Sequence, residues 1–383
     1  MKISYLLLGL GKRGGTLVLY NFMDHLVSRG HEVYAILPNK RIKWEVGIWK
    51  SITEKESLIK TIFLYLKAYL NPFSQDINHL SNGLIKNWVE SDITVATFCF
   101  TAYAGYYLSD KTLSLYHMQH LDEIFLHSKK DRLIARNTYY LPIIKISNSK
   151  WLKNVLQEKF NQESYLLNPG IDTKTFRPYI DPQEKYKEKK VWNMVSYFNE
   201  SDKWKGFADA VKAVKKAREH LQKNNIKLNW SVYGIEHPFK LYETEFKYLG
   251  PVFGDDLAKL YSQADLVLLA SWYESFPLPP IEAMACGSVI ITTRYGTEDY
   301  VFDGENGLVC LPREIDEIAA KIIQAIENPE ECLKMSLEGL KTAQRFDWEK
   351  RTDDLERIFK DALNNNSINN FEFFDDMQNS SKD

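Results

Sequence analysis

Residues 3–37 read ISYLLLGLGKRGGTLVLYNFMDHLVSRGHEVYAIL, and this stretch predicts the fold. The continuous apolar run at 3–8 is typical of a central parallel strand, because both faces of such a strand are covered. After a glycine loop, apolar residues recur at helical spacing over 16–29, and Gly30 ends the helix. Residues 31–37 form a second strand, so the stretch predicts one strand–helix–strand unit.

The same alternation of strands and helices continues through the rest of the chain. Further short apolar strands are predicted at 93–97, 113–116, 143–146, 192–197, 228–233, 266–270 and 289–293. Helical spacing recurs between some of them, as at 207–221 and 255–262. The predicted fold class is therefore α/β, with two doubly wound, Rossmann-like domains that face each other across a cleft.

A polar stretch separates the two halves. Residues 176–190, FRPYIDPQEKYKEKK, have the charge and proline content of a linker. We therefore predict one domain over 1–178 and a second over 179–347. A last helix at about 348–363 is expected to pack back on the first domain, and 364–383 is low in complexity and predicts a flexible tail.

Length and composition narrow the class of protein. At about 100–200 residues per domain, a chain of 383 residues predicts two domains. The net charge of −2 does not indicate a nucleic-acid-binding protein. The four cysteines follow no metal-ligand spacing, so we expect a reducing compartment and no metal. The N-terminal apolar run is too short for a bilayer span and lacks a cleavage site, which indicates a cytoplasmic location.

The strongest chemical signal is ESFPLPPIEAMACG at 274–287. Glu274 and Glu282 are eight positions apart, with a proline-rich loop between them and a helix predicted to begin at the second. An ionised carboxylate accepts hydrogen bonds from vicinal sugar hydroxyls, and a helix N-terminus attracts phosphate. The motif therefore predicts a site for hydroxyl groups and phosphate together. From spacing alone, a surface loop with two solvated glutamates is the alternative.

This motif resembles the E-x7-E signature of the family 4 retaining glycosyltransferases, which have the GT-B fold. Four further segments resemble that family in the same order along the chain: RGHEV at 29–33, NPGIDTKTFRP at 168–178, ADLVLLASWYE at 264–274 and GTEDYVFDGENGLVCLP at 296–312. The resemblance covers nearly the whole chain. It implies that the N-terminal domain binds the acceptor and the C-terminal domain binds a nucleotide sugar.

The resemblance also implies roles for individual residues of the second domain. Glu282 is expected to bind the ribose hydroxyls of the nucleotide, and Glu274 the hydroxyls of the donor sugar. The backbone N–H groups of Phe276 and Leu278 are expected near the diphosphate or the sugar. Pro277 has no N–H and cannot donate there.

A departing diphosphate needs positive charge, which the family supplies with an arginine and a lysine. In VSYFNESDKWKGF at 195–207, Lys205 matches the lysine, but no arginine is present. Lys203 is the nearest cation, although a lysine is a point charge and not a bidentate fork. Either Lys203 replaces the arginine or the site is weakened. The alternative for Lys205 is a solvated charge in a loop.

The glycine loop GLGKRGG of the first domain predicts a close approach to a ligand. The missing side chains of Gly14 and Gly15 let the backbone approach the donor diphosphate or the acceptor at a helix start. The loop also contains the dinucleotide pattern GxGxxG. However, the second strand ends without the carboxylate that NAD enzymes place on the ribose, which disfavours a dehydrogenase. A plain strand-to-helix turn is the remaining alternative.

A histidine of the first domain is expected near the reacting centre. Family members carry a His or an Asp at the place of LYHMQHLDE (115–123), and the resemblance implies that His120 fills this role. His117 is the alternative, and a purely structural histidine is a third possibility. Two histidines three positions apart also suggest a metal site, but no third and fourth ligands stand out.

Residues 40–67 form a basic stretch that includes Trp44 and Trp49. Such a stretch either lies on an anionic membrane surface, which would suit a lipid-linked acceptor, or packs on the domain as an ordinary amphipathic helix.

Together these features predict a metal-independent, retaining glycosyltransferase that needs no cofactor. It transfers a hexosyl or deoxyhexosyl group from a nucleotide-diphosphate-sugar donor to a glycan, lipid-linked or protein acceptor, by analogy in bacterial cell-surface polysaccharide or glycoconjugate synthesis. The expected location is cytoplasmic, with peripheral contact to the inner face of the membrane left open. Two alternatives remain: a catalytically silent, glycosyltransferase-like binding subunit or chaperone, suggested by the absent arginine, and a non-hydrolysing sugar-nucleotide epimerase, which shares the architecture.

Overall fold

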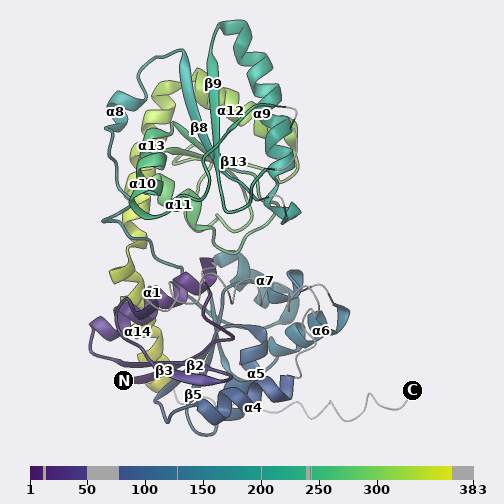
Figure 1. Cartoon of the computed structure of the whole chain (residues 1–383), viewed down its shortest axis with the longest axis vertical. Helices are drawn as coiled ribbons and strands as arrows, with labels where there is room; N and C mark the ends of the chain where they lie inside the picture. Colours follow the sequence, from purple (N-terminus) through teal and green to yellow (C-terminus); the bar gives the residue numbers. More distant parts are fainter. Residues whose placement is uncertain are drawn as a thin grey trace. The chain divides into compact units, whose positions relative to one another are not determined.

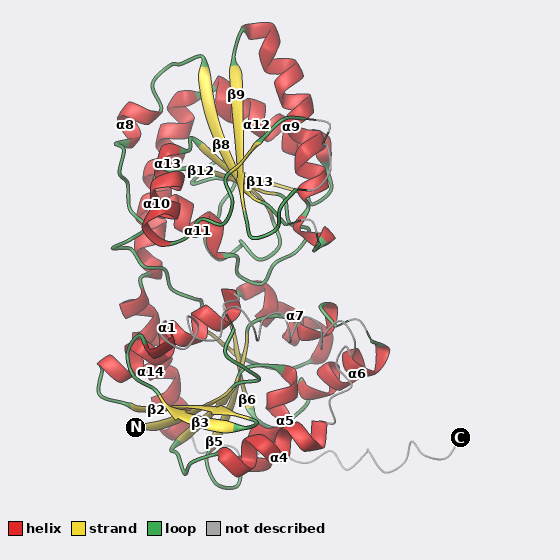
Figure 2. Cartoon of the chain, viewed as in Figure 1, coloured by secondary structure: helices red, strands yellow, loops and turns green. Residues whose placement is uncertain are grey.

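A computed structural model describes residues 1–11, 14–49, 77–126, 128–199, 201–238, 242 and 244–364. These residues form two compact units, each an α/β layer structure (Figures 1 and 2). Unit 1 consists of Met1–Ser147, Lys153–Leu167 and residues from Thr352 onward, and unit 2 consists of Asn148–Leu152 and Asn168–Arg351. Each unit has its own sheet, as the two series of apolar strands predicted.

Unit 1 is built on a seven-stranded sheet of order β3-β2-β1-β4-β5-β6-β7. Its strands are β1 (Lys2–Leu6), β2 (Glu32–Leu37), β3 (Lys40–Lys43), β4 (Ile93–Ala96), β5 (Leu113–Met118), β6 (Ile144–Ser147) and β7 (Tyr165–Leu166). All neighbours are parallel except the edge pair β2–β3, which is antiparallel. The carboxyl ends of the parallel strands therefore meet at one edge, which receives the glycine loop and the His120 segment.

Helices cover the sheet of unit 1 on both faces (Figure 1). They are α1 (Gly14–Ser28), α4 (Ile77–Asn87), α5 (Cys99–Leu108), the 3-10 turn η1 (Asp122–Ile124), α6 (Lys129–Thr138), α7 (Lys150–Phe160) and α14 (Trp348–Asn364). The last of these, α14, begins in unit 2 and continues into unit 1, where Arg29 donates to Asp353 at 2.6 Å and His31 lies 2.7 Å from Glu356. The predicted tail lies outside the described residues, apart from Asn364.

Unit 2 is built on a fully parallel sheet of order β10-β9-β8-β11-β12-β13. Its strands are β8 (Val191–Tyr197), β9 (Lys227–Tyr233), β10 (Lys247–Tyr248), β11 (Leu266–Leu269), β12 (Val289–Thr293) and β13 (Leu308–Cys310). The strand order reverses at β8 and β11, which are neighbours in the sheet. In open parallel sheets, ligands bind beyond the carboxyl ends of the strands at such a switch point.

The helices of unit 2 form one layer on each face of the sheet (Figure 1). They are α8 (Pro182–Lys185), η2 (Lys203–Lys205), α9 (Phe207–Leu221), η3 (Gln222–Asn224), α10 (Gly254–Gln263), α11 (Leu278–Ala285), α12 (Ile315–Glu327), α13 (Pro329–Ala343) and η4 (Gln344–Phe346). Phe207, Val211 and Val214 of α9 share one core with Ile318 and Ile322 of α12. Apolar residues of α10 and α11 fill a second core on the other face.

The prediction of a linker at 176–190 is wrong. Within this stretch, α8 packs on unit 2: Lys185 is buried, and its ammonium donates to the carbonyls of Ala264 and Gly287 at 3.0 Å each. The Tyr186 hydroxyl donates to the Asp265 carbonyl at 2.7 Å. These bonds satisfy the buried polar groups, so a composition typical of linkers is compatible with a packed segment.

In the described part of the basic stretch, only residues 48 and 49 are helical. Residues 40–43 form the edge strand β3, and Trp44 is only 2% exposed. The indole of Trp44 donates to Asp24 at 2.7 Å, and that of Trp49 to the same carboxylate at 3.1 Å. Trp44 is therefore a core residue and cannot face a membrane. Residues 50–67 of the stretch lie outside the described residues.

Candidate active site

Two loops meet at the switch point of unit 2. One follows β8 and carries η2; the other follows β11 and carries Glu274. The two loops are in close contact at Gly206. Its φ is +69°, and a Cβ added there would lie 1.9 Å from the Ala270 carbonyl oxygen. The backbone N–H of Trp272 also donates to the Trp204 carbonyl at 2.7 Å. Only glycine permits this conformation and this approach, which bring the predicted lysine to the predicted glutamate.

Lys205 and Glu274 form an ion pair, with Nζ 2.7 Å from Oε1. The same Oε1 accepts from the Ser271 hydroxyl at 2.8 Å. The Glu274 side chain is 5% exposed and that of Lys205 is 22% exposed. A carboxylate this deeply buried needs a cation and hydrogen bonds, and the pair supplies both. Lys205 is therefore not a solvated loop charge.

A third loop holds the backbone of Glu274. Gly296, after β12, has a φ of +90°, and a Cβ there would lie 2.3 Å from the Glu274 carbonyl oxygen. The Glu274 N–H donates to the Tyr295 carbonyl at 3.3 Å. Loops after β8, β11 and β12 thus converge on one carboxylate. The sequence analysis did not identify Ser271 or Gly296; a glycine directly after a predicted strand is the one signal that could have pointed to Gly296.

Helix α11 begins at Leu278, so Glu282 lies in its second turn and not at its start. The N-cap is Pro277, and the prolines at 279 and 280 have no N–H to offer a phosphate. At this N-terminus the N–H of Leu278 is therefore the first backbone donor. The Phe276 side chain is buried, with its ring centroid 5.0 Å from that of Tyr300.

Glu282 is half-buried by accessible surface, and burial raises its pKa from 4.5 to about 8. No hydrogen bond or ion pair to its carboxyl is found among the described residues, and its neighbours include the hydroxyls of Tyr233 and Tyr261. Since the folded protein favours the protonated form, the carboxyl of Glu282 is neutral at pH 7. A neutral carboxyl can donate one hydrogen bond and accept another, which suits two vicinal hydroxyls.

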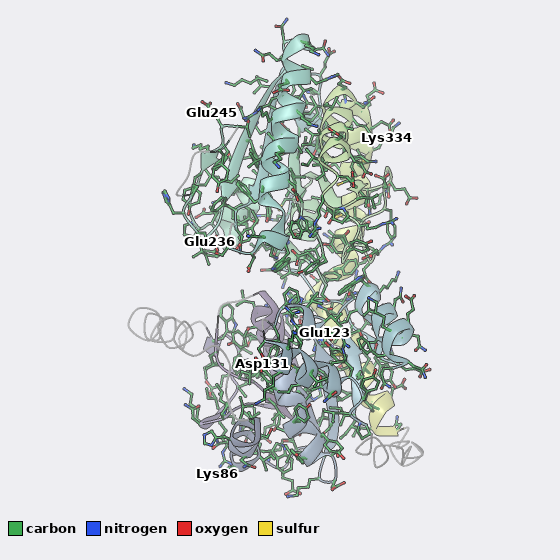
Figure 3. The ribbon with its side chains drawn as sticks, turned by 90° about the vertical axis from the view of Figure 1, so that its right-hand side faces the viewer. Lys86, Glu123, Asp131, Glu236, Glu245 and Lys334 are labelled. Carbon is green, nitrogen blue, oxygen red and sulfur yellow. The ribbon has the colours of Figure 1, made fainter. Side chains whose placement is uncertain are left out.

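Lys203 is exposed at the start of η2, and its side chain has no hydrogen-bond or ion-pair partner within the described part of the chain. The neighbouring residue Ser201 donates its N–H to Glu236 at 3.0 Å, which ties the loop after β8 to the loop after β9 (Glu236 is labelled in Figure 3). The Lys203 ammonium is therefore available to an anion, whereas that of Lys205 is already paired.

In unit 1, neither packing nor backbone conformation explains the glycines at 14 and 15. Gly14 is the first residue of α1, and a Cβ added there meets no atom of the described residues within 4 Å. At Gly15 an added Cβ would touch Gln119 at an ordinary 3.6 Å, and neither glycine has a positive φ. The space beside them leaves room for a ligand at the helix N-terminus.

The two histidines after α5 have different environments. His117, in β5, is 1% exposed, both ring nitrogens lack hydrogen-bond partners among the described residues, and burial lowers its pKa to about 3. His120 lies beyond the end of β5, is half-buried and packs against Phe125 at 4.8 Å between centroids. Of the two predicted alternatives, His120 is the one with an exposed part that a ligand can reach.

Asp122 is a structural residue of the same segment. Its carboxylate accepts from the Cys99 N–H at 2.8 Å and from the Tyr116 hydroxyl at 2.7 Å. Burial raises the pKa of Asp122 to about 6. The neighbouring Glu123, labelled in Figure 3, pairs with Arg136 at 2.7 Å. These contacts anchor the segment that carries His120.

The described residues contain no group of three or more His, Cys, Asp or Glu side chains arranged to hold a metal ion. None of the helices within them combines the length and the apolar composition that a membrane crossing requires.

Residues 179–342, most of unit 2, match the family model for glycosyl transferases group 1. A curated relative is the O-antigen chain mannosyltransferase B of Escherichia coli, 36% identical over 106 residues; this alignment spans only 28% of each chain. This part of the protein is thus similar to the group 1 glycosyltransferase domain.

Solved structures share the fold over nearly the whole chain. Sucrose-phosphate synthase of Thermosynechococcus elongatus has a TM-score of 0.73 at 17% identity, covering 95% of this chain and 99% of its own. The Anabaena protein HepE, solved with UDP-glucose, has a TM-score of 0.69 at 18% identity, covering 94% and 100%. The GT-B fold class predicted from the sequence is confirmed.

Proposed function

We propose that this protein is a retaining glycosyltransferase that takes its sugar from a nucleotide-diphosphate donor. The buried Lys205–Glu274 pair at the switch point of unit 2 carries the proposal. The group 1 glycosyltransferase domain at 179–342 supports it, as does the shared fold of HepE, whose structure contains UDP-glucose. The family 4 assignment and its E-x7-E motif are part of the same proposal.

Each site residue has a chemical role in this mechanism. Glu274 accepts hydrogen bonds from hydroxyls of the donor sugar, while the neutral carboxyl of Glu282 binds the ribose diol. The ammonium of Lys205, helped by that of Lys203 and the N–H of Leu278, stabilises the charge that develops on the departing diphosphate. Gly14, Gly15 and His120 of unit 1 are proposed to lie at the acceptor and the reacting centre.

No protein nucleophile is assigned. The anomeric configuration of the sugar is retained because the acceptor attacks from the same face that the diphosphate leaves. The acceptor proposed is a glycan, a lipid-linked saccharide or a protein in cell-surface polysaccharide or glycoconjugate synthesis. Neither a metal nor another cofactor is part of the mechanism, so turnover should survive addition of a chelator. A fall in turnover that magnesium restores would contradict this part.

The first experiment is a thermal-shift screen with UDP, GDP and ADP. A ligand that binds only the folded protein raises its melting temperature, so at least one nucleoside diphosphate should do so. Release of that diphosphate from matching donor sugars then measures turnover. Glu274→Gln should reduce turnover about 100-fold, a size typical of lost transition-state contacts. Glu338→Gln, which alters a glutamate paired with Lys341 at 2.6 Å on the exposed face of α13, should not reduce it.

A silent binding subunit is the second candidate, favoured by the missing arginine after β8. This candidate predicts stabilisation by a nucleoside diphosphate but no release from any donor in the panel. Equal turnover of Glu274→Gln and wild type would contradict the proposed catalytic roles.

Peripheral membrane contact is also proposed, because Lys40, Arg41 and Lys43 are exposed along β3. Anionic vesicles should then carry the protein in flotation at low salt and lose it at high salt. Absence of binding at low salt would remove the membrane from the proposal.

A further inference from the structure

Arg313 has a backbone conformation that arginine rarely adopts. Its φ is +68°, in the turn between β13 and α12. The residue is exposed, and no hydrogen bond or ion pair of its side chain is found among the described residues. Non-glycine residues in this region are strained, and such residues cluster at functional sites. The strain at Arg313 thus indicates that its side chain has a function.

An indole ring fixes the guanidinium of Arg313, whose Cζ lies 3.7 Å from the centroid of Trp272. Trp272 is itself fixed, because its indole N–H donates to Asp209 at 2.7 Å and its backbone N–H donates to Trp204. Stacking covers one face of a guanidinium but leaves the N–H groups in its plane available. An oxyanion can accept two of these N–H groups at once.

Aromatic rings and the candidate donor site lie next to this arginine. The rings of Trp204 and Tyr273 are stacked, 5.4 Å apart at 7°. Burial raises the pKa of Tyr273, the charge of Glu274 raises it further, and the charge of Arg313 lowers it. The Tyr273 hydroxyl therefore lies within the electrostatic range of both charges. Half-exposed aromatic faces of this kind can pack against the C–H groups of a sugar ring.

We propose that Arg313, with Trp272 and Tyr273, binds an oxyanion group of the acceptor saccharide, either a carboxylate or a phosphate. The proposal rests on the proposed function and names the acceptor class: an acidic sugar. Arg313 leads into α12 and Trp272 is bonded to α9, and these two helices pack together on one face of the sheet. Leu278 and Glu282 lie on α11, on the other face (Figure 1). The proposed mechanism already assigns the ammonium groups of Lys203 and Lys205 and the N–H of Leu278 on α11 to the donor diphosphate, which favours the acceptor as the partner of Arg313.

Three acidic residues follow Arg313, and the structure assigns two of them other partners. Asp316 pairs with Lys216, and Glu317 accepts from the Leu311 N–H at 2.9 Å. Glu314 is exposed and is not paired with Arg313. Within the described residues the charge of Arg313 is therefore not neutralised by a direct partner, and an oxyanion can take that place.

The test follows the Trp272 indole N–H by NMR in ¹⁵N-tryptophan-labelled protein, with the signal assigned from Trp272→Phe. The probes are methyl glucuronide, glucose 6-phosphate and the neutral methyl glucoside. One or both acidic probes should shift the signal, and the difference between them identifies carboxylate or phosphate. Arg313→Asn removes the charge, and asparagine tolerates a left-handed φ. This variant should bind the acidic probe about tenfold more weakly, as expected for one lost charged contact.

Arg177→Gln is the matched control. Arg177 is also exposed and lies over a ring, that of Tyr179, at 5.1 Å. Its neighbour Pro178 packs beside Gly287, beyond the C-terminal end of α11. This variant should bind the acidic probe as wild type does. The proposal is overturned if neutral and acidic probes act alike, if Arg313→Asn binds like wild type, or if Arg313→Asn instead weakens binding of the nucleoside diphosphate. Failure of every nucleoside diphosphate to stabilise the protein would count against the proposed function alone, because the NMR titration needs no donor.

Discussion

The ammonium of Lys205 and the carboxylate of Glu274 are 2.7 Å apart, although 69 positions separate them in the chain. The contact depends on Gly206, whose left-handed conformation turns the chain directly after the lysine. It also depends on β8 and β11 being neighbours, because their carboxyl ends then open on the same edge. The pair therefore links the order of strands in the sheet to the charge distribution of the candidate site.

Removal of Lys205 should destabilise unit 2. Lys205→Ala leaves the largely buried Glu274 carboxylate without its cation, and we expect a loss of about 2 kcal/mol in the free energy of unfolding. Lys203→Ala removes an exposed, unpaired cation two positions away and should change stability by less than about 0.5 kcal/mol. Urea unfolding of both variants gives the two values. Equal values would mean that the pair contributes nothing to stability.

Glu282 should make stability depend on pH. Its pKa is raised by burial from 4.5 to about 8, so between these values the folded protein holds a proton that the unfolded chain has lost. Stability from this group is therefore fully present below about pH 4.5 and falls as pH rises through about 8. Glu282→Gln keeps a neutral side chain throughout and lacks this dependence.

Comparison of these two proteins isolates Glu282, since other titrating groups such as Asp122 are present in both. Unfolding free energies measured from about pH 5 to about pH 8 should show wild type losing stability relative to Glu282→Gln. A constant difference across that range would mean that the carboxyl ionises at its ordinary pKa.

The two histidines of unit 1 should respond differently to replacement. His117 is buried, and its ring nitrogens have no hydrogen-bond partner within the described ranges; such a group costs about 1–3 kcal/mol of stability. His117→Leu should therefore be at least as stable as wild type and should keep its turnover. His120→Ala should fold normally and lose turnover. Thermal melts and release of nucleoside diphosphate check both variants. If only His117→Leu loses turnover, His117 and not His120 is the residue near the reacting centre.

Long, regular elements could be predicted from the sequence, and short ones could not. The helix at 207–221 has the predicted bounds, because Phe207, Val211 and Val214 repeat at helical spacing towards one core. Strands β7 and β10 have two residues each, and β13 has three, which is too short for a period to appear. Helix α12 was missed although its apolar residues also follow a helical period.

For the candidate site, the sequence predicted the types of residue better than it predicted how those residues are arranged. The sequence pattern selected Glu274 and Lys205, but nothing local indicated that they form a pair or that Ser271 shares the carboxylate. The sequence left open whether Trp44 faces a membrane or packs on the domain, because its partner, Asp24, lies in another element. Contacts between elements depend on the fold and are not encoded in local composition.

Alanine substitutions at Gly14 and Gly206 should distinguish a glycine that leaves space for a ligand from a glycine that the fold requires. At Gly206 an added Cβ would lie 1.9 Å from the Ala270 carbonyl oxygen, and the φ is +69°. Gly206→Ala should therefore cost about 2 kcal/mol or more, because both the left-handed conformation and the clash oppose it. At Gly14 an added Cβ meets no atom within 4 Å in the part of the chain that the structure describes, and the residue begins a helix, where alanine is favoured.

Gly14→Ala should consequently melt at or above the wild-type temperature, and any loss of turnover must then come from a methyl group in the space where a ligand approaches. Melting temperatures, nucleoside diphosphate binding and turnover of the two variants distinguish the cases, since a general folding defect lowers all three together. If Gly14→Ala binds the donor and turns over as wild type does, the glycine loop is a plain turn, and Gly14 has no place in the site.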